Sequence, residues 1–171
     1  MDLAQTPTWA LALIYALHML STVVWIGGLA ALVTLVLPAA QRTLDIKSYA
    51  ALLENIQRRL DPLGWFCLAV LAGTGMFQMS ANPNYHGFMA INNRWAMAIL
   101  LKHGGYLLMI GVSAYISGWL LPNLRRAALR LAQGKDAPAL DQLQRHNILL
   151  LRLNLVLAVL ILALTALARV S

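Results

Sequence analysis

The chain has little charge and almost no cysteine. Only 11% of its 171 residues are charged, against about 25% in soluble globular domains. Hydrophobic residues make up 60% of the chain. This composition excludes a disordered chain and an ordinary soluble enzyme, and it predicts a membrane protein. Cys67 is the one cysteine, so no disulfide can form within a single chain.

Acidic side chains are the scarcer of the two charged classes. The chain has 6 acidic and 13 basic residues, which gives a net charge of +7. In so apolar a sequence, this excess is explained by basic connections that orient the protein in the lipid bilayer, and no nucleic-acid partner is expected. The sequence pattern places all six acids in termini or connections, so we expect none within a membrane span. The N-terminus has no basic region of the kind that begins a cleavable signal peptide.

Four apolar stretches are long enough, or nearly long enough, to span a bilayer. They cover residues of about 9–37, 63–79, 95–121 and 148–168. Pro38 and Pro122 are expected to end the first and third helices, and Pro62 to begin the second. The short connections favour an all-α, up-down-up-down four-helix bundle, an integral membrane protein with a single domain over residues 1–171.

Residues 41–60 have a different pattern, because apolar positions recur at helical spacing with charged residues between them. They predict a cytoplasmic amphipathic segment between helices 1 and 2, or cytoplasmic extensions of these helices. Basic residues are concentrated in the 1–2 and 3–4 connections: Arg42, Lys47, Arg58, Arg59, Arg125, Arg126, Arg130, Lys135 and Arg145. Only Arg94 and Arg169 lie on the other side. The positive-inside rule then predicts a multi-pass protein of the inner or plasma membrane with both termini on the outer, periplasmic side.

Ionisable residues inside a span are costly and mark candidate sites. His18 lies roughly 13 Å into the first helix and His103 roughly 12 Å into the third, at 1.5 Å per residue. Two imidazoles at one level are suited to hold haem b between helices 1 and 3 as axial ligands of its iron. Trp25 and Tyr106 share their helix faces, and Lys102 is placed to meet a cofactor carboxylate or a lipid phosphate. Each histidine has a plainer alternative role, hydrogen bonding across helices.

A second candidate site is rich in methionine. Met76 and Met79 lie one turn apart, and His86, Met89 and Met97 follow them. Thioether and imidazole ligands suit Cu(I), so His86, Met76 and Met79 form the alternative, copper site. Methionine also fills apolar interiors without any metal, and both interpretations stay open.

Several short runs resemble a known family. Leu17-His18-Met19 and Val24-Trp25-Ile26-Gly27-Gly28-Leu29 resemble the first helix of the copper resistance protein D (CopD) family. The stretch from Trp95 to Lys102, and Pro122-Asn123-Leu124-Arg125, resemble that family's lysine-bearing helix and the loop after it. His18 and Lys102 also match a first-helix histidine and a third-helix lysine of the related HemJ group of protoporphyrinogen oxidases. The sequence departs from CopD at His103, where an aliphatic residue is expected, and at Asn154, where an acid is common.

The resemblance implies copper uptake for a CopD-like protein, and haem binding with tetrapyrrole oxidation for a HemJ-like one. Combined with the His18 and His103 pair, it favours a haem protein that transfers electrons in the membrane. Its partners would be the lipid bilayer and other subunits of a membrane redox complex. The alternatives are a copper import or copper resistance protein, a HemJ-like oxidase, and a non-catalytic structural subunit. Whether the chain is an enzyme is left open.

Overall fold

The structure is a computed structural model that describes residues 7–82, 87 and 94–169. Within these ranges the chain is built from helices and contains no strand. The helices are α1 (Thr8–Ala31), α2 (Leu37–Thr43), α3 (Ile46–Ser80), α4 (Arg94–Tyr115), α5 (Leu121–Ala132) and α6 (Ala139–Arg169). Two five-residue π-helical turns, η2 (Leu32–Val36) and η3 (Ile116–Leu120), join α1 to α2 and α4 to α5.

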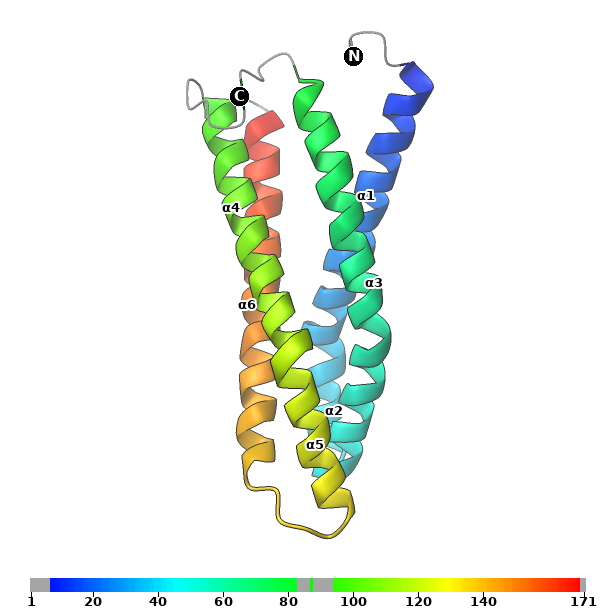
Figure 1. The fold of residues 1–171 in the computed structure, drawn as a ribbon, viewed down its shortest axis with the longest axis vertical. Coiled ribbons are helices and arrows are strands. Elements are labelled where there is room, and N and C mark those ends of the chain that lie inside the picture. Colours follow the sequence, from blue (N-terminus) through cyan, green and yellow to red (C-terminus); the bar gives the residue numbers. More distant parts are fainter. Residues whose placement is uncertain (1–6, 83–86, 88–93, 170–171) are drawn as a thin grey trace.

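The helices form four long rods, because the π turns make one continuous rod of α1 with α2 and another of α4 with α5 (Figure 1). The beginnings of α1 and α4 and the ends of α3 and α6 lie at one end of the molecule, here called the terminal end. The α2–α3 and α5–α6 connections lie at the other end, here called the basic end because most of the lysines and arginines are near it.

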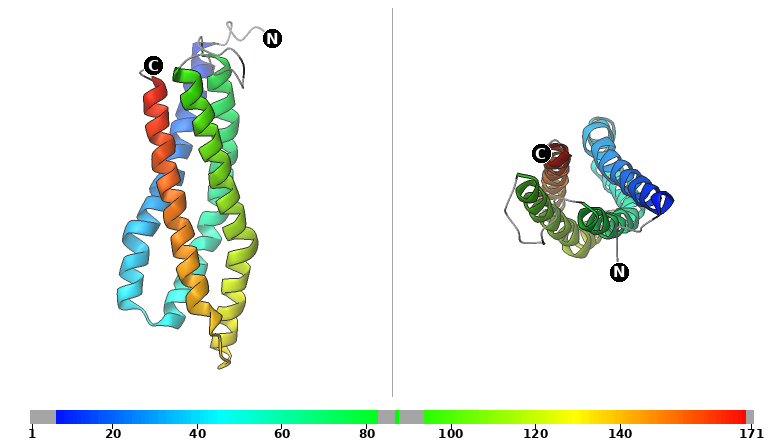
Figure 2. Two further views of the ribbon diagram at one scale, coloured as in Figure 1. Left: turned by 90° about the vertical axis from the view of Figure 1, so that its left-hand side faces the viewer. Right: turned by 90° about the horizontal axis from the view of Figure 1, so that it is seen from above.

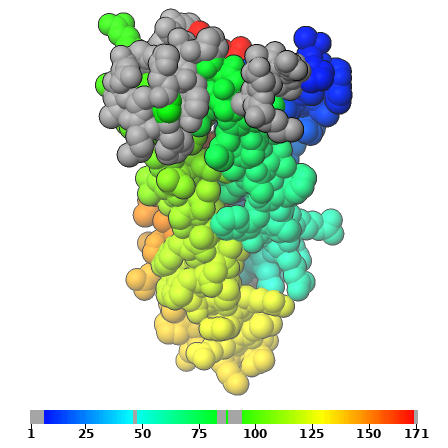
Figure 3. All heavy atoms as spheres, turned by 45° about the horizontal axis from the view of Figure 1, so that its top comes forward, coloured from blue at the N-terminus to red at the C-terminus, as the bar shows by residue number. Residues whose placement is uncertain are grey.

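The rods pack as two pairs that join toward the basic end. α1 packs along α3, and α4 packs along α6. α5 contacts both α3 and α6, while α1 contacts α6 over a shorter stretch (Figure 2). The space-filling view shows α4 and α5 directly beside α3, with the molecule tapering toward the basic end (Figure 3). The larger core cluster, which includes Leu32, Leu53 and Leu120, lies where all four rods contribute.

The surface of the bundle exposes many large hydrophobic side chains, as expected of a surface that faces lipid. Large hydrophobic side chains such as Trp9, Phe66 and Leu149 are well exposed, whereas Asn147 and Asn154 are among the most deeply buried residues. Over the described ranges, four helical stretches are long and apolar enough to cross a membrane: Thr8–Thr43, Ser48–Ser80, Arg94–Ala132 and Ala139–Arg169. The predicted class, an all-α membrane protein with four helices, is confirmed.

Pro38 and Pro122 do not end their helices, contrary to the sequence prediction. Each follows a π turn and occupies the first turn of the next helical segment. A proline in a regular α-helix removes one hydrogen bond and clashes with the carbonyl four residues earlier. The wider π turn accommodates the proline, so the rod continues. The same arrangement occurs twice in the chain: one π turn is followed directly by Leu37-Pro38, and the other by Leu121-Pro122.

Pro62 does not begin the second helix either, because it lies inside the 35-residue helix α3. Most of the amphipathic segment predicted at residues 41–60 is the first half of α3, and its beginning completes α2. It therefore extends the spanning helices, which was one of the two alternatives, and it is not a separate surface helix. The apolar face of its first half packs into the core through Leu53, so the helix persists despite the missing hydrogen bond at Pro62.

Candidate functional site

His18 is held by a hydrogen bond between helices. Its Nδ1 lies 2.8 Å from the Thr74 hydroxyl on α3, and that hydroxyl donates its single proton to the Val70 carbonyl at 2.6 Å. The hydroxyl must then accept from His18, so Nδ1 carries the ring proton and Nε2 carries the lone pair. Metal-binding histidines are oriented in this way, with one ring N–H donated to a neighbouring oxygen.

His103 has the same tautomer for a different reason. Its Nδ1 lies 2.7 Å from the Ile99 carbonyl of its own helix, and a carbonyl can only accept. The two histidines predicted to face one another are therefore each oriented by a different element, His18 by α3 and His103 by α4. A shared ligand between them stays a prediction.

The other residues predicted beside the histidines have separate roles. The Tyr106 hydroxyl donates to the Leu68 carbonyl and so ties α4 to α3. Lys102 is half-buried on α4. Trp25 packs its ring against Gly64 on α3. Of this set, only Trp25 lines the interior cavity described next.

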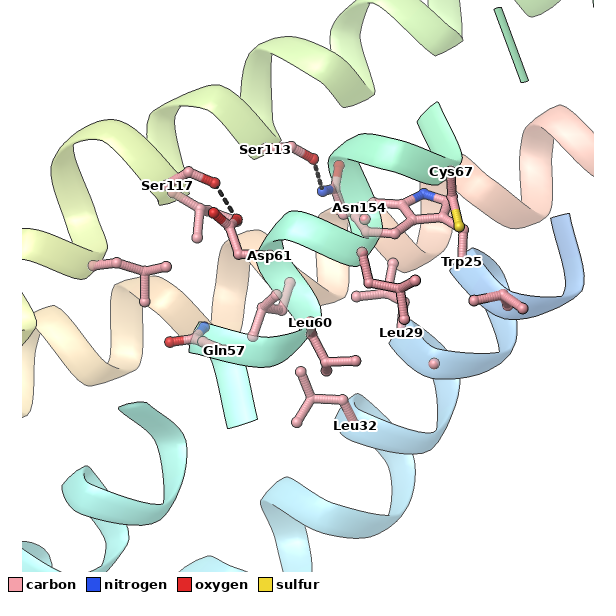
Figure 4. Close-up of a pocket in the computed structure, with 17 residues that line it drawn as sticks. Trp25, Leu29, Leu32, Gln57, Leu60, Asp61, Cys67, Ser113, Ser117 and Asn154 are labelled. Carbon is pink, nitrogen blue, oxygen red and sulfur yellow. Dashed lines mark hydrogen bonds between the residues drawn. The ribbon is translucent and has the colours of Figure 1, made fainter. Parts of the chain in front are cut away.

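A cavity of about 70 Å³ lies inside the bundle between the four rods (Figure 4). Its lining is mostly apolar, and its polar residues and cysteine are Gln57, Asp61, Cys67, Ser113, Ser117 and Asn154. Ser117 donates to the Asp61 carboxylate and accepts the Trp65 indole N–H at 3.3 Å. Asn154 donates to Ser113 at 2.9 Å. The cavity is therefore framed by hydrogen bonds that link α3 and α6 to the α4–α5 rod.

Three polar atoms at this cavity have no hydrogen-bond partner among the described residues. They are Gln57 Oε1, Asn154 Oδ1 and Trp25 Nε1. Leaving a buried polar group unpaired costs about 1–3 kcal/mol. Two of the three atoms are amide oxygens that can only accept, and the Cys67 sulfur lies in the same lining. The cavity is thus suited to a cation or to water that supplies hydrogen bonds.

Asp61 corrects an expectation from the sequence. It was assigned to a connection because Pro62 was expected to begin a helix. In the structure it lies within α3, inside the candidate span Ser48–Ser80, and its carboxylate faces the bundle interior toward Ser117. The expectation that Asp61 lies in a connection is therefore wrong. The sequence signal that was available is the helical spacing from Gln57 through Asp61 to Gly64 and Cys67.

The predicted copper site at the methionines is described only in part. Met76 is 57% exposed on the outside of α3, whereas Met79 is 8% exposed and buried. His86 and Met89 lie outside the described residues. Across 7–82, 87 and 94–169, no three His, Cys, Asp or Glu side chains gather as a metal-binding group. A copper site here would have to use thioether, hydroxyl or amide groups as well.

The elements of the site are aligned along α3. Thr74, which holds His18, lies seven residues from Cys67, two helical turns or about 10 Å along the axis. Gln57 lies ten residues beyond Cys67, about 15 Å further toward the basic end. The His18–Thr74 contact and the interior cavity therefore lie one after the other along α3.

The profile of the family described as Copper resistance protein D (CopD) matches residues 54–168. The chain belongs to the CopD family. This match covers about two-thirds of the sequence and contains the cavity residues of α3, α4 and α6, whereas His18 and Trp25 precede it. Neither a curated protein nor a solved structure gives a significant match. Membership of CopD relates this multi-pass membrane protein to copper resistance.

Proposed function

We propose that this CopD protein carries copper ions through the interior of its helix bundle. One observation carries the proposal: a cavity lined by Cys67, Gln57 and Asn154 lies along α3 from the oriented His18, and the two amide oxygens have no hydrogen-bond partner among the described residues. The family relation to copper makes copper the cargo to consider first.

Side chains on and beside α3 fit Cu(I), with Cys67 and Thr74 on one face of the helix and Met79 about 140° around it from Thr74. A soft monovalent ion prefers thiolate, thioether and imidazole donors. Met79 is buried near the terminal end of α3, His18 presents Nε2 at the level of Thr74, and Cys67 follows two turns further on. Steps of about 7 and 10 Å along the axis separate these levels. Each of these levels offers only a few ligands to the ion. Such weak binding favours transport of the ion, because an ion that is bound too tightly is not released.

Asp61 supplies the negative charge that a cation needs inside a low-dielectric bundle. Ionisable groups in spans face the interior and mark ion pathways. Its carboxylate already accepts from Ser117, which fixes its direction (Figure 4). A cation leaving Cys67 toward the basic end would next meet this carboxylate.

Copper accumulation by cells tests this function. Cells producing the protein should hold more copper than cells that lack it, measured by mass spectrometry at equal protein level. Cys67→Ser, which keeps the size and polarity but removes the soft ligand, should abolish most of the excess. His146→Ala is the control, because His146 is exposed near Tyr115 at the basic end and should leave accumulation unchanged. Equal copper in cells with and without the protein would reject the proposal.

A second candidate is a haem b held by His18 and His103, which would pass electrons to other subunits of a membrane redox complex. The observation that favours it is that Nδ1 of each ring is held by an oxygen, that of Thr74 for His18 and that of Ile99 for His103, as in histidines that bind metals through Nε2. Haem would supply one-electron redox chemistry, and His18 and His103 would hold its iron.

An oxidised-minus-reduced visible spectrum of the purified protein tests the second candidate. Bands of six-coordinate haem b that disappear in both His18→Ala and His103→Ala would support it. A haem-bearing protein that also oxidises protoporphyrinogen, in a manner dependent on Lys102, would instead favour the HemJ-like activity. A preparation that binds copper and shows no haem bands would leave copper transport as the function.

A further inference from the structure

A second and larger cavity, of about 390 Å³, lies at the basic end between α3, α5 and α6. Its lining contains arginine side chains, which the lining of the interior cavity does not. It contains three guanidinium groups, those of Arg58, Arg125 and Arg126, and one carboxylate, Glu54. Glu54 lies 3.0 Å from Arg125 Nε. Three positive charges against one negative leave the lining with an excess of two positive charges.

One residue of this lining carries a buried donor without a partner among the described residues. Gln144 on α6 is only 6% exposed, and its Nε2 has no hydrogen-bond partner among the described residues. An amide NH₂ can only donate, as can a guanidinium. The cavity therefore offers donors to whatever fills it, and its chemistry is that of an anion site.

We propose that this cavity binds a phosphate group, carried by an anionic lipid headgroup or by free inorganic phosphate. Guanidinium groups match the oxygens of a phosphate in a bidentate manner, and Arg58, Arg125 and Arg126 are exposed residues that a phosphate group can reach. Basic pockets between membrane helices on the cytoplasmic side are suited to anionic headgroups. The apolar part of the lining includes Leu53, Leu124 and the half-exposed Leu129, which gives an acyl chain apolar contacts.

The phosphate site adjoins the interior cavity, because Gln57, Ser117 and Leu121 line both. A bound phosphate would lower the positive potential that a cation meets on leaving Asp61 toward the basic end. The binding site itself stands on the donors of α3, α5 and α6, and it does not depend on copper being the cargo.

Binding to the purified protein in a neutral detergent tests the proposal. The probes are phosphatidylglycerol, inorganic phosphate and phosphatidylcholine, with bound lipid counted by native mass spectrometry and phosphate binding measured by calorimetry. Arg58→Gln and Arg126→Gln should each weaken binding of the anionic probe at least about tenfold, since hydrogen bonds to charged groups contribute about 1.5–3 kcal/mol. Arg145→Gln is the matched control, because Arg145 pairs with Asp141 on the surface of α6 and should bind as the wild type does.

The probes separate the two sources of the phosphate group. Binding of phosphatidylglycerol without inorganic phosphate assigns a lipid headgroup, and saturable binding of inorganic phosphate assigns the free ion. If Arg126→Gln unfolds, Arg126→Lys replaces it, and the loss of bidentate geometry should still weaken binding. Retention of phosphatidylcholine as strong as that of phosphatidylglycerol, with no phosphate binding, would overturn the proposal. So would wild-type affinity in both arginine variants.

Discussion

His18 on α1 donates its Nδ1–H to the Thr74 hydroxyl on α3 across 2.8 Å. Because the Thr74 proton is already used in the bond to Val70, the direction of the bond is fixed, and the histidine presents Nε2 as its lone-pair nitrogen. The same contact joins the two helices that pack most closely in their half of the bundle. The orientation of His18 therefore depends on the packing of α1 against α3, whereas His103 is oriented within its own helix.

Thr74→Val should weaken Cu(I) binding at His18. Valine keeps the shape of threonine but cannot accept the Nδ1–H, so the ring loses its orienting partner. Loss of such a partner typically lowers metal affinity 10–100-fold. A competition titration with a Cu(I) chelator measures the change.

The control for Thr74→Val is Thr165→Val. Thr165 also donates to a carbonyl of its own helix, that of Ile161, and among the described residues its hydroxyl is not hydrogen-bonded to a histidine. It should leave affinity unchanged. Equal losses in both variants would mean that the effect comes from the helix and not from His18.

Asp61→Asn should reduce copper transport at least about tenfold while the protein still folds. Asparagine keeps an oxygen that can accept from Ser117 but removes the charge that offsets a cation in the bundle interior. Transport rates at saturating copper measure the change. Asp141→Asn, which removes an exposed carboxylate paired with Arg145, should have no effect, and a matching loss there would refute the role of Asp61.

Gly64→Ala should destabilise the protein by about 1–3 kcal/mol, the usual cost of overpacking. A Cβ at Gly64 would overlap the Trp25 ring, so α1 and α3 would have to separate or the indole would have to move. Gly73→Ala on the same helix is the control, because no heavy atom lies within 4 Å of its Cβ position. Thermal unfolding in detergent should show a lower midpoint for the first variant only, and a similar midpoint in both would contradict this packing.

The basic connections predict the orientation of the chain. Fusion of alkaline phosphatase at the C-terminus should give an active enzyme, because that end is expected outside the cytoplasm. Fusion within residues 133–138, between α5 and α6, should give an inactive one. The reverse pattern would place both termini in the cytoplasm and invert the proposed direction of the copper path.

Hydropathy was sufficient to predict the four helical rods, because each contains an apolar run long enough to cross a bilayer. Proline was the source of the boundary errors. At Pro38 and Pro122 a π turn accommodates the ring, and at Pro62 the packed first half of α3 maintains the helix. Such compensations depend on tertiary contacts, which local sequence patterns do not contain.

The candidate site was predicted less completely than the fold. His18 and Lys102 were singled out because ionisable residues inside spans are rare, and their roles stay predictions. Asp61 was missed as a direct result of the error at Pro62. Gln57 and Asn154 were not recognised as partners of one cavity because they lie on different helices, and only the packing of α3 against α6 and the α4–α5 rod brings them together.

The central claim is that copper passes through this bundle by way of His18. The most direct test is the rate of Cu(I) entry into sealed proteoliposomes that contain the purified protein, compared with protein-free vesicles. We expect saturable entry with the wild type, entry lowered at least about tenfold by His18→Ala, and normal entry with His146→Ala. Entry at the rate of protein-free vesicles, or a wild-type rate in His18→Ala, would contradict the account.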